Sequence, residues 1–517
     1  MGKDVFPTVL QIRHLTVTHR KDLRRMTDNL TFSLGPHDKA AIIGEEGDGK
    51  STLLKLIYNP RLTEDYAEYT GDIIKSGRIG YLAQELSGRQ RQMTVYEFFC
   101  ATEHFYDSTP AELAQIARDI ALPGDIFYSD QPIGTLSGGE SVKLRLAALM
   151  IARPDLLLLD EPSNDLDIDA LEWLERFIIN ADVPVLFVSH DETLLERTAN
   201  VLLHLEQVRR KTSPMHTVSR CTYREYVERR AASRAHQTQM ARKEKAEYEK
   251  QQAKFLRIQS RVEHEQNVIS RADPHGGRML KKKMAAVKSM ERRFDREYGN
   301  MTQLPETEDE IFVRFDPAII TPKGKTVLDL HLDILKNEGG TLAHDIHLHI
   351  AGGEKVCIVG PNGSGKTTLL RHIASLLLPQ PDLRVAYMPQ NYAEGMDFSL
   401  TPVQFLSRTG DKDELTHIRT YLGSMRYTPD EMEHAIGALS GGQKAKLYFI
   451  ALNLNRCDVL LLDEPTRNFS PLSGPIIRNA LCEFGGTIIA VSHDRKFIGE
   501  VCEKRFSIPA NRQTNRR

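Results

Sequence analysis

The sequence predicts an α/β protein in which two similar domains are joined by a long α-helical hairpin. Three observations support this prediction. Four short motifs occur twice, in the same order and at matching spacing. In each copy, the first motif follows an apolar run of strand length and precedes a helical pattern. Between the copies lies a basic segment with the periodicity of long helices. The length of 517 residues also exceeds what a single hydrophobic core accommodates.

The first repeated motif is a glycine-rich loop. Residues 44–51 (GEEGDGKS) and 360–367 (GPNGSGKT) both fit the pattern G-x-x-x-x-G-K-[ST]. Strand-like runs precede them at 40–43 and 356–359. In this setting, backbone N–H groups surround a phosphate at a helix N-terminus, where the helix dipole favours anions. Both loops are therefore expected to bind nucleotide phosphates.

Three further motifs follow each loop. They are LSGG (136–139 and 439–442), an apolar run ending in Asp-Glu-Pro (156–162 and 459–465) and VSHD (188–191 and 491–494). The interval from the motif serine to the aspartate is 23 residues in both halves, and that from the aspartate to the histidine is 30. A glutamine follows the loop lysine by 34 residues in the first half and by 24 in the second. We therefore expect a small insertion of about ten residues within 58–80.

These motifs resemble those of the ATP-binding-cassette family in both halves of the chain. The resemblance implies an α/β core with a mostly parallel sheet, plus a helical subdomain that carries LSGG. It also implies that the two P-loop ATP-binding-cassette domains pair head to tail, so that the Ser-Gly-Gly of one covers ATP held by the other. ATP and Mg²⁺ are the expected cofactors, and ATP hydrolysis is the expected reaction. ATP binding would close the pair and hydrolysis would open it.

The resemblance assigns roles to individual residues. The expected catalytic residues are Glu161 and Glu464, which would polarise water, and His190 and His493, which would contact the γ-phosphate. The expected Mg²⁺ ligands are Ser51, Gln84, Asp160, Thr367, Gln390 and Asp463. The expected nucleotide-binding residues of the first half are Gly44, Gly47, Gly49, Lys50, Ser51, Thr52, Gln84, Ser137, Gly138, Gly139 and Asp160. Those of the second half are Gly360, Gly363, Gly365, Lys366, Thr367, Thr368, Gln390, Ser440, Gly441, Gly442 and Asp463.

Two features depart from the family pattern. After the first Glu-Pro, residues 163–167 (SNDLD) are close to the usual loop, whereas 466–471 (TRNFSP) lack its terminal carboxylate and contain a proline. An aromatic residue that stacks on adenine is expected upstream of each glycine-rich loop. The first half offers only His19, which is equally compatible with a surface position, and the second offers no clear candidate. Both sites carry the glutamate needed for hydrolysis, and the differing loops predict that they are coupled asymmetrically.

The segment between the repeats predicts an antiparallel pair of helices. Before a break at 271–277, apolar residues recur every seven positions at Tyr248, Phe255, Val262 and Ile269. After it, they step by threes and fours at Leu280, Met284, Val287, Met290, Phe294 and Tyr298. The Pro-Gly-Gly stretch is the expected tip, and the first helix is expected to run about 50 residues.

This segment is also strongly basic. Residues 209–298 contain 24 Lys or Arg against 11 Asp or Glu, although the net charge of the whole chain is −2. A solvated coiled coil without a ligand is the alternative, but an excess of one sign favours a polyanionic partner. The residues expected to contact nucleic acid are Arg271, Arg278, Lys281, Lys282, Lys283 and Lys288.

The composition excludes several classes of protein. No run approaches the roughly 18 to 20 apolar residues that cross a bilayer, and the N-terminus lacks an apolar signal core. Six cysteines are scattered without a C-x-x-C pair, which argues against a zinc site or a disulfide framework. We therefore expect a cytoplasmic protein with no membrane domain.

Two cassettes with a charged helical linker and no membrane domain resemble the ABC-F family. The linker and the 466–471 loop are more similar to its antibiotic-resistance branch. The resemblance implies a monomer with intramolecular pairing of the cassettes, bound to the 50S ribosomal subunit. The linker would reach rRNA, P-site tRNA and the peptidyl-transferase centre, and displace antibiotics. The expected domains are a first cassette (1–210), the basic helical hairpin (211–300), a second cassette (301–510) and a short basic tail (511–517).

Three other functions remain open from the sequence. A housekeeping ABC-F translation factor would share every motif. The ATPase subunit of a membrane transporter with a separate channel polypeptide would leave the basic hairpin without a purpose. A DNA-repair ATPase would usually carry a zinc module or a longer coiled coil between its halves, and neither is present.

Overall fold

The computed structural model describes residues 8–208, 213–268, 274–299, 315, 319, 321–322, 324–337, 340–425 and 427–508. The chain divides into two compact units. Unit 1 comprises Met1–Tyr223 and Glu308–Arg517 and contains both cassettes, and unit 2 comprises Arg224–Thr307. Among the helices of the described part, none combines the length and the apolar character that a membrane span requires.

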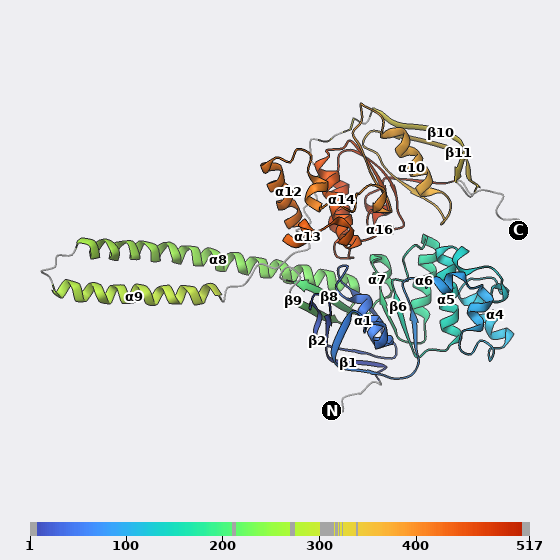
Figure 1. Ribbon diagram of the computed structural model, residues 1–517, viewed down its shortest axis with the longest axis horizontal. Coiled ribbons are helices and arrows are strands. Elements are labelled where there is room, and N and C mark those ends of the chain that lie inside the picture. Colours follow the sequence, from blue (N-terminus) through green and yellow to red (C-terminus); the bar gives the residue numbers. More distant parts are fainter. Residues whose placement is uncertain are drawn as a thin grey trace. The chain divides into compact units, whose positions relative to one another are not determined.

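A six-stranded sheet forms the centre of the first cassette (Figure 1). Its strand order is β5 (Ile79–Leu82), β6 (Leu156–Asp160), β7 (Val185–Val188), β3 (Lys39–Ile43), β8 (Val201–Val208) and β9 (Ser213–Ser219). All neighbouring strands are parallel except β8 and β9, which pair antiparallel. Strand β9 lies beyond residue 210, the expected end of the first cassette. The central strands are continuous apolar runs because a parallel sheet is covered on both faces.

A second, antiparallel sheet packs against the first through a shared apolar core. Its strand order is β2 (Arg25–Leu34), β1 (Leu10–His19) and β4 (Ala67–Lys75). The remaining elements are helices, most of them begun by a side-chain cap. They are α1 (Lys50–Tyr58), α2 (Gly88–Gln92), α3 (Val95–Cys100), α4 (Pro110–Asp119), α5 (Gly138–Ile151), α6 (Ile168–Asn180) and α7 (Glu192–Thr198).

The second cassette repeats this architecture. Its parallel sheet has the order β13 (Val385–Met388), β14 (Val459–Asp463), β15 (Thr487–Val491), β12 (Lys355–Val359) and β16 (Lys504–Ser507). Its helices are α10 (Lys366–Leu377), α11 (Pro402–Leu406), α12 (Lys412–Ser424), α13 (Pro429–Glu433), α14 (Gly441–Leu454), α15 (Gly474–Glu483) and α16 (Arg495–Glu500). The equivalent strand order in the two halves confirms the predicted α/β fold with two cassettes.

The extra residues of the first half contain a strand. Strand β4 lies within the predicted insertion at 58–80 and pairs with β1. In the second cassette, the described residues form an antiparallel sheet of two strands, β10 (Thr326–Asn337) and β11 (Gly340–Ala351). The longer interval between lysine and glutamine in the first half therefore accommodates a third strand.

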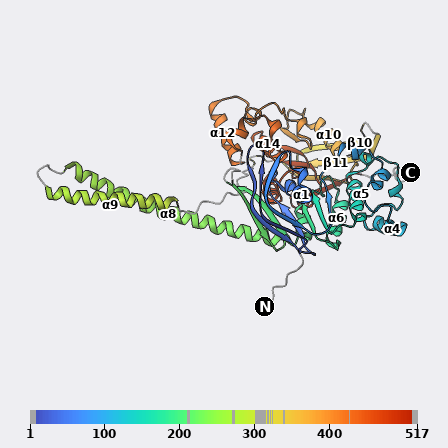
Figure 2. The same ribbon diagram turned by 60° about the horizontal axis from the view of Figure 1, so that its bottom comes forward.

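Unit 2 is a helical hairpin. Helix α8 (Tyr223–Val268) is 46 residues long, or about 69 Å at ~1.5 Å per residue, and α9 (Pro274–Gly299) lies beside it (Figures 1 and 2). Phe255 and Val262 of α8 pack with Met284 and Val287 of α9. Two of the predicted heptad positions, Phe255 and Val262, therefore lie at the seam between the two helices, and Ile269 lies outside the described residues.

The tip of the hairpin differs from the expectation in one respect. The break was expected to run through Gly277, but α9 begins at Pro274 and includes both glycines. Proline is favoured in the first turn of a helix because its fixed φ suits the helix and its missing N–H would have no partner there. Residues 269–273, and Arg271 with them, lie outside the described residues.

Candidate functional site

Each glycine-rich loop links the end of a central strand to the start of a helix. In the first cassette the loop joins β3 to α1, whose first residue is Lys50. Gly49 has φ 89°, a left-handed conformation that favours glycine. At Gly44, an added Cβ would lie 2.4 Å from the carbonyl oxygen of Leu205. The loop therefore needs glycine both for its turn and for its close approach to β8.

The loop lysines fold back over their own loops. The Nζ of Lys50 donates to the carbonyl oxygens of Gly44 (2.9 Å) and Glu45 (2.8 Å). Lys366 makes the same pair of bonds, 2.9 Å each, in the second loop. Burial lowers the pKa of Lys50 and also lowers the pKa of Lys366. Each ammonium group is therefore held by two carbonyl oxygens of its own loop, at the place where a phosphate would be received.

A hydroxyl and a carboxylate meet beside each loop. Ser51 Oγ donates to Asp160 Oδ1 at 2.8 Å, and Thr367 Oγ1 donates to Asp463 Oδ1 at 3.3 Å. Both aspartates end a buried central strand, and burial raises the pKa of Asp463 to about 6. Tyr81, three residues before Gln84, donates its hydroxyl to Asp160 at 3.1 Å. Hydroxyl and carboxylate oxygens are the donors that Mg²⁺ prefers, so the residues present fit that ion.

The two glutamates after these aspartates adopt the same unusual backbone conformation. Glu161 has φ 50° and Glu464 has φ 51°, which is left-handed and costly for a residue with a side chain. In the first cassette, Glu161 lies 3.4 Å from His190 Nε2 and accepts from Gln84 Nε2 at 3.0 Å. In the second, Glu464 lies 3.8 Å from His493 Nε2 and accepts from the His493 N–H at 3.2 Å. Both glutamates are thus oriented by the predicted histidines.

The electrostatic environments of the two glutamates differ. Burial alone would raise the pKa of Glu161, but the hydrogen bond and charge of His190, together with Lys50, bring that pKa to about 2. Burial dominates at Glu464 and raises its pKa to about 8. Burial and the nearby Lys366 lower the pKa of His493 to about 4. The asymmetry between the halves therefore extends to the groups beside the expected water position.

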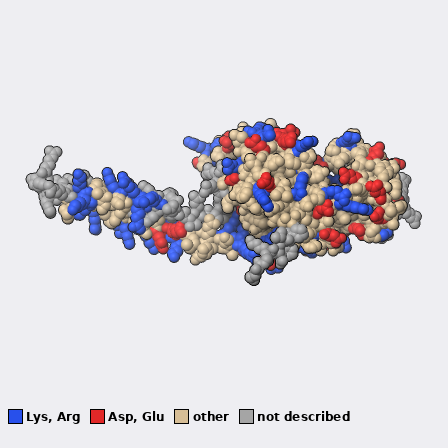
Figure 3. Space-filling model, turned by 90° about the horizontal axis from the view of Figure 1, so that it is seen from below, with Lys and Arg blue, Asp and Glu red and all other residues tan. Residues whose placement is uncertain are grey.

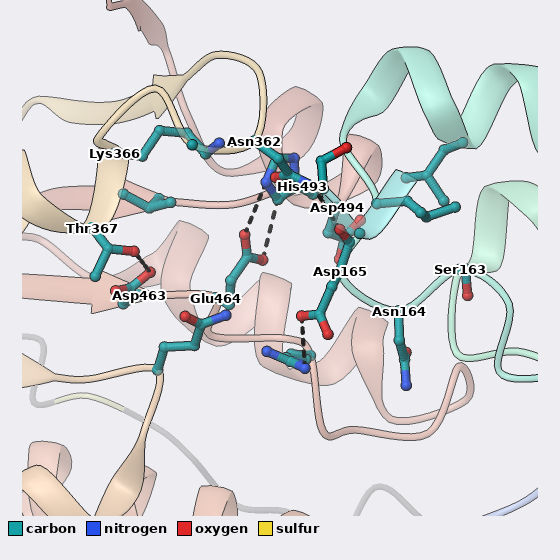
Figure 4. A pocket seen from close by; sticks show the side chains of 18 of the residues that line it. Ser163, Asn164, Asp165, Asn362, Lys366, Thr367, Asp463, Glu464, His493 and Asp494 are labelled. Atoms are coloured by element: carbon teal, nitrogen blue, oxygen red, sulfur yellow. Dashed lines mark hydrogen bonds and ion pairs between the residues drawn. The ribbon is translucent and has the colours of Figure 1, made fainter. Parts of the chain in front are cut away.

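A cavity at the second glycine-rich loop combines residues of both cassettes (Figure 4). It has a volume of about 570 Å³ and is called site 2 below. The second cassette contributes Gly363, Gly365, Lys366, Thr367, Thr368, Gln390, Asp463, Glu464 and His493. The first contributes Ser137, Gly138 and the loop 163–166. Asn362 Nδ2 donates to the carbonyl oxygen of Asp165 at 2.6 Å across this boundary. The cavity thus brings Ser137 and Gly138 of the first cassette together with the loop of the second, whereas the expected Gly139 and Gly360 are not among its lining residues.

The cavity at the first loop, site 1, is less complete. It measures about 430 Å³ and is lined by Gly47, Gly49, Lys50, Ser51, Thr52, Gln84, Glu161 and His190, with Arg467 and Asn468 from the second cassette. Ser440, Gly441 and Gly442 are not part of its lining. His190 Nδ1 is 2.9 Å from the carbonyl oxygen of Phe469, so the two cassettes do meet here.

Site 1 has an aromatic residue that sequence reasoning missed. Tyr66 lines this cavity together with the predicted His19. The His19 ring is held by Asp22 (Nδ1 to Oδ1, 2.7 Å). Tyr66 follows the glycine-rich loop, inside the insertion that contains β4, so a search upstream of the loop could not find it. Site 2 is lined at the corresponding edge by Asn337 and Leu342.

Ion pairs beside the two sites join the cassettes. Arg478 on α15 contacts Glu192 on α7 at 2.6 Å and Glu500 on α16 at 2.7 Å. Arg495 Nη2 is 2.5 Å from Glu175, and Lys496 Nζ is 2.5 Å from Glu196. Across the boundary, the first cassette supplies the acids and the second supplies the bases. Nothing in the linear order of these residues pointed to this interface.

Five of the six candidate nucleic-acid contacts lie on α9. Lys281, Lys282, Lys283 and Lys288 are exposed along this helix, and Figure 3 shows basic side chains along much of one face of the hairpin. The side chain of Arg278 lies outside the described part, as does all of Arg271.

Two glycine-rich loops, two strand-end Asp-Glu pairs and a cavity shared by both halves define the class of ATP-binding-cassette ATPases. The ABC transporter family model matches residues 27–164 and 343–467. Ribosome protection protein VmlR of Bacillus subtilis is 30% identical over 93% of this chain and 84% of its own length. Tylosin resistance ATP-binding protein TlrC of Streptomyces fradiae is 30% identical over 93% of this chain and 94% of its own. ABC transporter F family member 2 of Arabidopsis thaliana is 26% identical over 92% and 73%.

The chain belongs to the ABC-F family of tandem-cassette ATPases, and it binds and hydrolyses ATP. A solved complex of archaeal ribosomal stalk protein aP1 with archaeal ribosome recycling factor aABCE1 is similar at a TM-score of 0.58. That likeness covers 96% of this chain and 88% of the other at 18% identity, and it concerns the fold alone.

Proposed function

We propose that this ATPase is an ATP-gated ribosome-binding factor that protects the ribosome from antibiotics. The observation that carries the proposal is similarity along 93% of the chain to a ribosome protection protein. The exposed lysines of α9 support it, because a cationic rod suits the phosphate backbone of rRNA and tRNA. The proposed partners are the 50S subunit and P-site tRNA in the cytoplasm, with the hairpin directed toward the peptidyl-transferase centre. The proposed domain boundaries remain 210, 300 and 510.

The chemistry proposed for each site follows from its residues. In site 2, the phosphates would draw Lys366 away from the loop carbonyls, and Glu464 would orient the attacking water. Thr367, Asp463 and Gln390 would hold Mg²⁺, which would neutralise charge on the β- and γ-phosphates. His493 would contact the γ-phosphate. In site 1 the equivalent groups are Lys50, Ser51, Asp160, Gln84, Glu161 and His190.

The proposed composite sites make ATP a bridge between the cassettes. Ser137 caps helix α5 and Ser440 caps α14, so each presents backbone N–H groups of the Ser-Gly-Gly motif at a helix N-terminus. A γ-phosphate bound there while held by the opposite glycine-rich loop stabilises the closed pair. Hydrolysis removes the bridge, and the ribosome-bound state is thereby destabilised.

The test is a double Glu161→Gln, Glu464→Gln variant. It should retain ATP and co-sediment with ribosomes in ATP at least about tenfold more than the wild type, because the closed state persists. The matched control adds Lys50→Ala and Lys366→Ala, which should abolish the enrichment. Equal co-sedimentation of the double variant with and without ATP would contradict ribosome gating. Recovery with an integral membrane protein would instead support a transporter role.

A housekeeping translation role is the second candidate. Putative ATP-binding protein YdiF of Bacillus subtilis is 29% identical over 96% of this chain, close to the identity of the resistance proteins. Expression in a drug-sensitive host separates the two roles. Protection predicts a raised inhibitory concentration for one or more of lincosamides, pleuromutilins, streptogramins, phenicols and macrolides. No change for any of them, with ATP-dependent ribosome binding intact, would favour the housekeeping role.

A further inference from the structure

The two glycine-rich loops differ in charge at their centres. The first loop carries Glu45 and Glu46 where the second carries Pro361 and Asn362. Acidic side chains are unfavourable beside bound phosphates because like charges repel. Their presence in one loop only suggests that they do something that the second loop does not.

The carboxylate of Glu46 occupies the start of helix α14 in the opposite cassette. Its Oε1 accepts from the Gly441 N–H at 3.2 Å, and its Oε2 accepts from the Gly442 N–H. These are the first two N–H groups of a 14-residue helix, where the dipole favours an anion. They are also the groups proposed above to receive the γ-phosphate of ATP at site 1. Glu46 thus holds an anionic group where a phosphate oxygen would bind.

A second contact holds the loop in this position. Glu45 pairs with Lys446 of α14 at 3.2 Å, and the lysine side chain is 9% exposed. In the first cassette the residue at the same place in α5 is Lys143, whose Nζ lies 5.2 Å over the ring of Trp173. The ion pair between Glu45 and Lys446 is therefore found at site 1, whereas the equivalent lysine at site 2 contacts an aromatic ring instead.

The cavities at the two sites differ at the place where Glu46 contacts α14. Glu46 lines site 1 on one side and, on its other side, a separate space of about 20 Å³ that contains Ser440 and Gly442. At site 2, Ser137 and Gly138 share one open cavity with Lys366. The residue equivalent to Glu46, Asn362, donates to the carbonyl oxygen of Asp165 and leaves the helix start open to that cavity. Glu46 therefore divides site 1 in two.

We propose that Glu46 is an internal substitute for the γ-phosphate, which closes site 1 in the absence of ATP and must be displaced when ATP binds. The proposal rests on the composite ATP sites proposed above. Glu46 is exposed on its remaining surface, so it can turn to solvent without losing a buried environment. Because one set of N–H groups cannot serve two anions, ATP competes with Glu46 and ADP, which lacks the γ-phosphate, does not. Glu46 thus lowers the preference of site 1 for ATP over ADP, and site 2 becomes the site that ATP closes more readily.

Nucleotide titrations of the full-length chain test this proposal. Lys366→Ala with Glu161→Gln confines binding to site 1 and prevents its turnover. On that background, Glu46→Asn should tighten Mg·ATP binding roughly tenfold and change Mg·ADP binding less than about twofold. The matched exchange, Asn362→Glu with Lys50→Ala and Glu464→Gln, should weaken Mg·ATP binding at site 2 by a similar factor.

Two results would overturn the proposal. One is unchanged Mg·ATP affinity after Glu46→Asn. The other is equal tightening for Mg·ATP and Mg·ADP, which would mean that Glu46 acts only as a nearby negative charge. Ser440→Glu on the site 1 background tests whether the Ser-Gly-Gly motif of the second cassette contributes to site 1 at all. It therefore distinguishes a wrong role for Glu46 from a wrong composite site. If Ser440→Glu weakens Mg·ATP binding while Glu46→Asn has no effect, only the role of Glu46 is refuted; if neither has an effect, the shared site itself is refuted.

Discussion

At the scale of single residues, the first glycine-rich loop contains a third acid with a different environment. Asp48 is only 6% exposed, and its Oδ2 accepts from the Glu45 N–H at 2.7 Å. Burial raises its pKa to about 7, with Glu45 and Glu206 adding to the rise and Lys50 opposing it. The second loop has Ser364 at this position. The first loop therefore carries a carboxyl group that titrates in the neutral range.

We expect Asp48 to make stability depend on pH. The folded chain holds this proton up to a pH of about 7, whereas the unfolded chain releases it near the ordinary aspartate pKa of 3.8. The folded state binds more protons over that range, so the stability contribution of the protonated group is lost as pH rises through it. Between pH 5 and pH 8 this linkage costs the wild type roughly 3 kcal/mol of stability. Asp48→Asn removes the cost, so it should raise the melting temperature of the nucleotide-free protein more at pH 8 than at pH 5. Ser364→Asn is the control and should show no such pH dependence; an equal effect of Asp48→Asn at both pH values would contradict the prediction.

Tyr66 is expected to bind the nucleotide base at site 1. It lines the same cavity as the glycine-rich loop, and stacking of a base on an aromatic ring contributes about 1–3 kcal/mol. Tyr66→Ala should weaken nucleotide binding about tenfold in a chain whose second site is inactivated by Lys366→Ala, while Tyr66→Phe should bind normally. His19→Ala should have the smaller effect because Asp22 already holds that ring. A stronger loss from His19→Ala than from Tyr66→Ala would assign the stacking role to the histidine instead.

At the scale of elements, helices α7, α15 and α16 join the cassettes through buried charges. The Arg478 side chain is 3% exposed and the Glu192 side chain 8%, so neither has water as an alternative partner. Acids on one cassette and bases on the other also disfavour pairing of two identical cassettes, because like charges would then face each other. The ion pairs therefore specify which halves combine.

We expect Arg478 to be essential for this interface. Arg478→Met leaves Glu192 buried without the guanidinium that it contacts, and removal of one partner of a buried pair costs about 3–5 kcal/mol. Urea denaturation should show the loss, and hydrogen exchange should show faster exchange in α7 and α16. Arg419→Met is the control, since Arg419 and Glu433 are 50% and 58% exposed and such pairs contribute about 0–1 kcal/mol. Similar losses in the free energy of unfolding for the two variants would show that the buried pair contributes no more to stability than the exposed pair.

At the scale of the whole molecule, the hairpin provides the cationic surface proposed to meet the ribosome. Lys281, Lys282 and Lys283 are exposed near the start of α9. Changing all three to Ala should weaken ribosome binding. It should also reduce the dependence of log affinity on log salt by about one for each phosphate that a lysine no longer neutralises. Binding measured across several salt concentrations tests this.

The matched control uses three exposed lysines of α8, Lys245, Lys250 and Lys254, which lie farther from the turn. Their replacement by Ala removes the same charge, so a purely diffuse electrostatic effect would give the same change in slope. We expect a smaller change, because direct contacts at the tip release more counterions than distant charges do. Equal slopes for both triple variants would argue against contact near the turn.

Much of the fold and most of the proposed site follow from local sequence. The G-x-x-x-x-G-K-[ST] pattern already predicts a strand, a glycine turn and a helix, because only glycine tolerates the backbone at Gly44 and Gly49. The heptad spacing of Phe255 and Val262 predicts the hairpin seam, since the helical period repeats along one face. The start of α9 was misplaced because glycines signal a break even where a preceding proline can begin a helix.

The sequence alone determined the duplication, the chemical groups at both ATP sites and the long basic hairpin. Only the tertiary structure decided which residues of one cassette meet the other, such as Glu46 with Gly441 and Arg478 with Glu192, and it alone placed Tyr66 in the cavity of the first loop. The physical reason is the distance along the chain that separates the interacting residues. Turns, caps and strand-to-helix transitions depend on neighbours along the chain, whereas Glu46 and Gly441 are 395 residues apart and meet only through the packing of two folded domains.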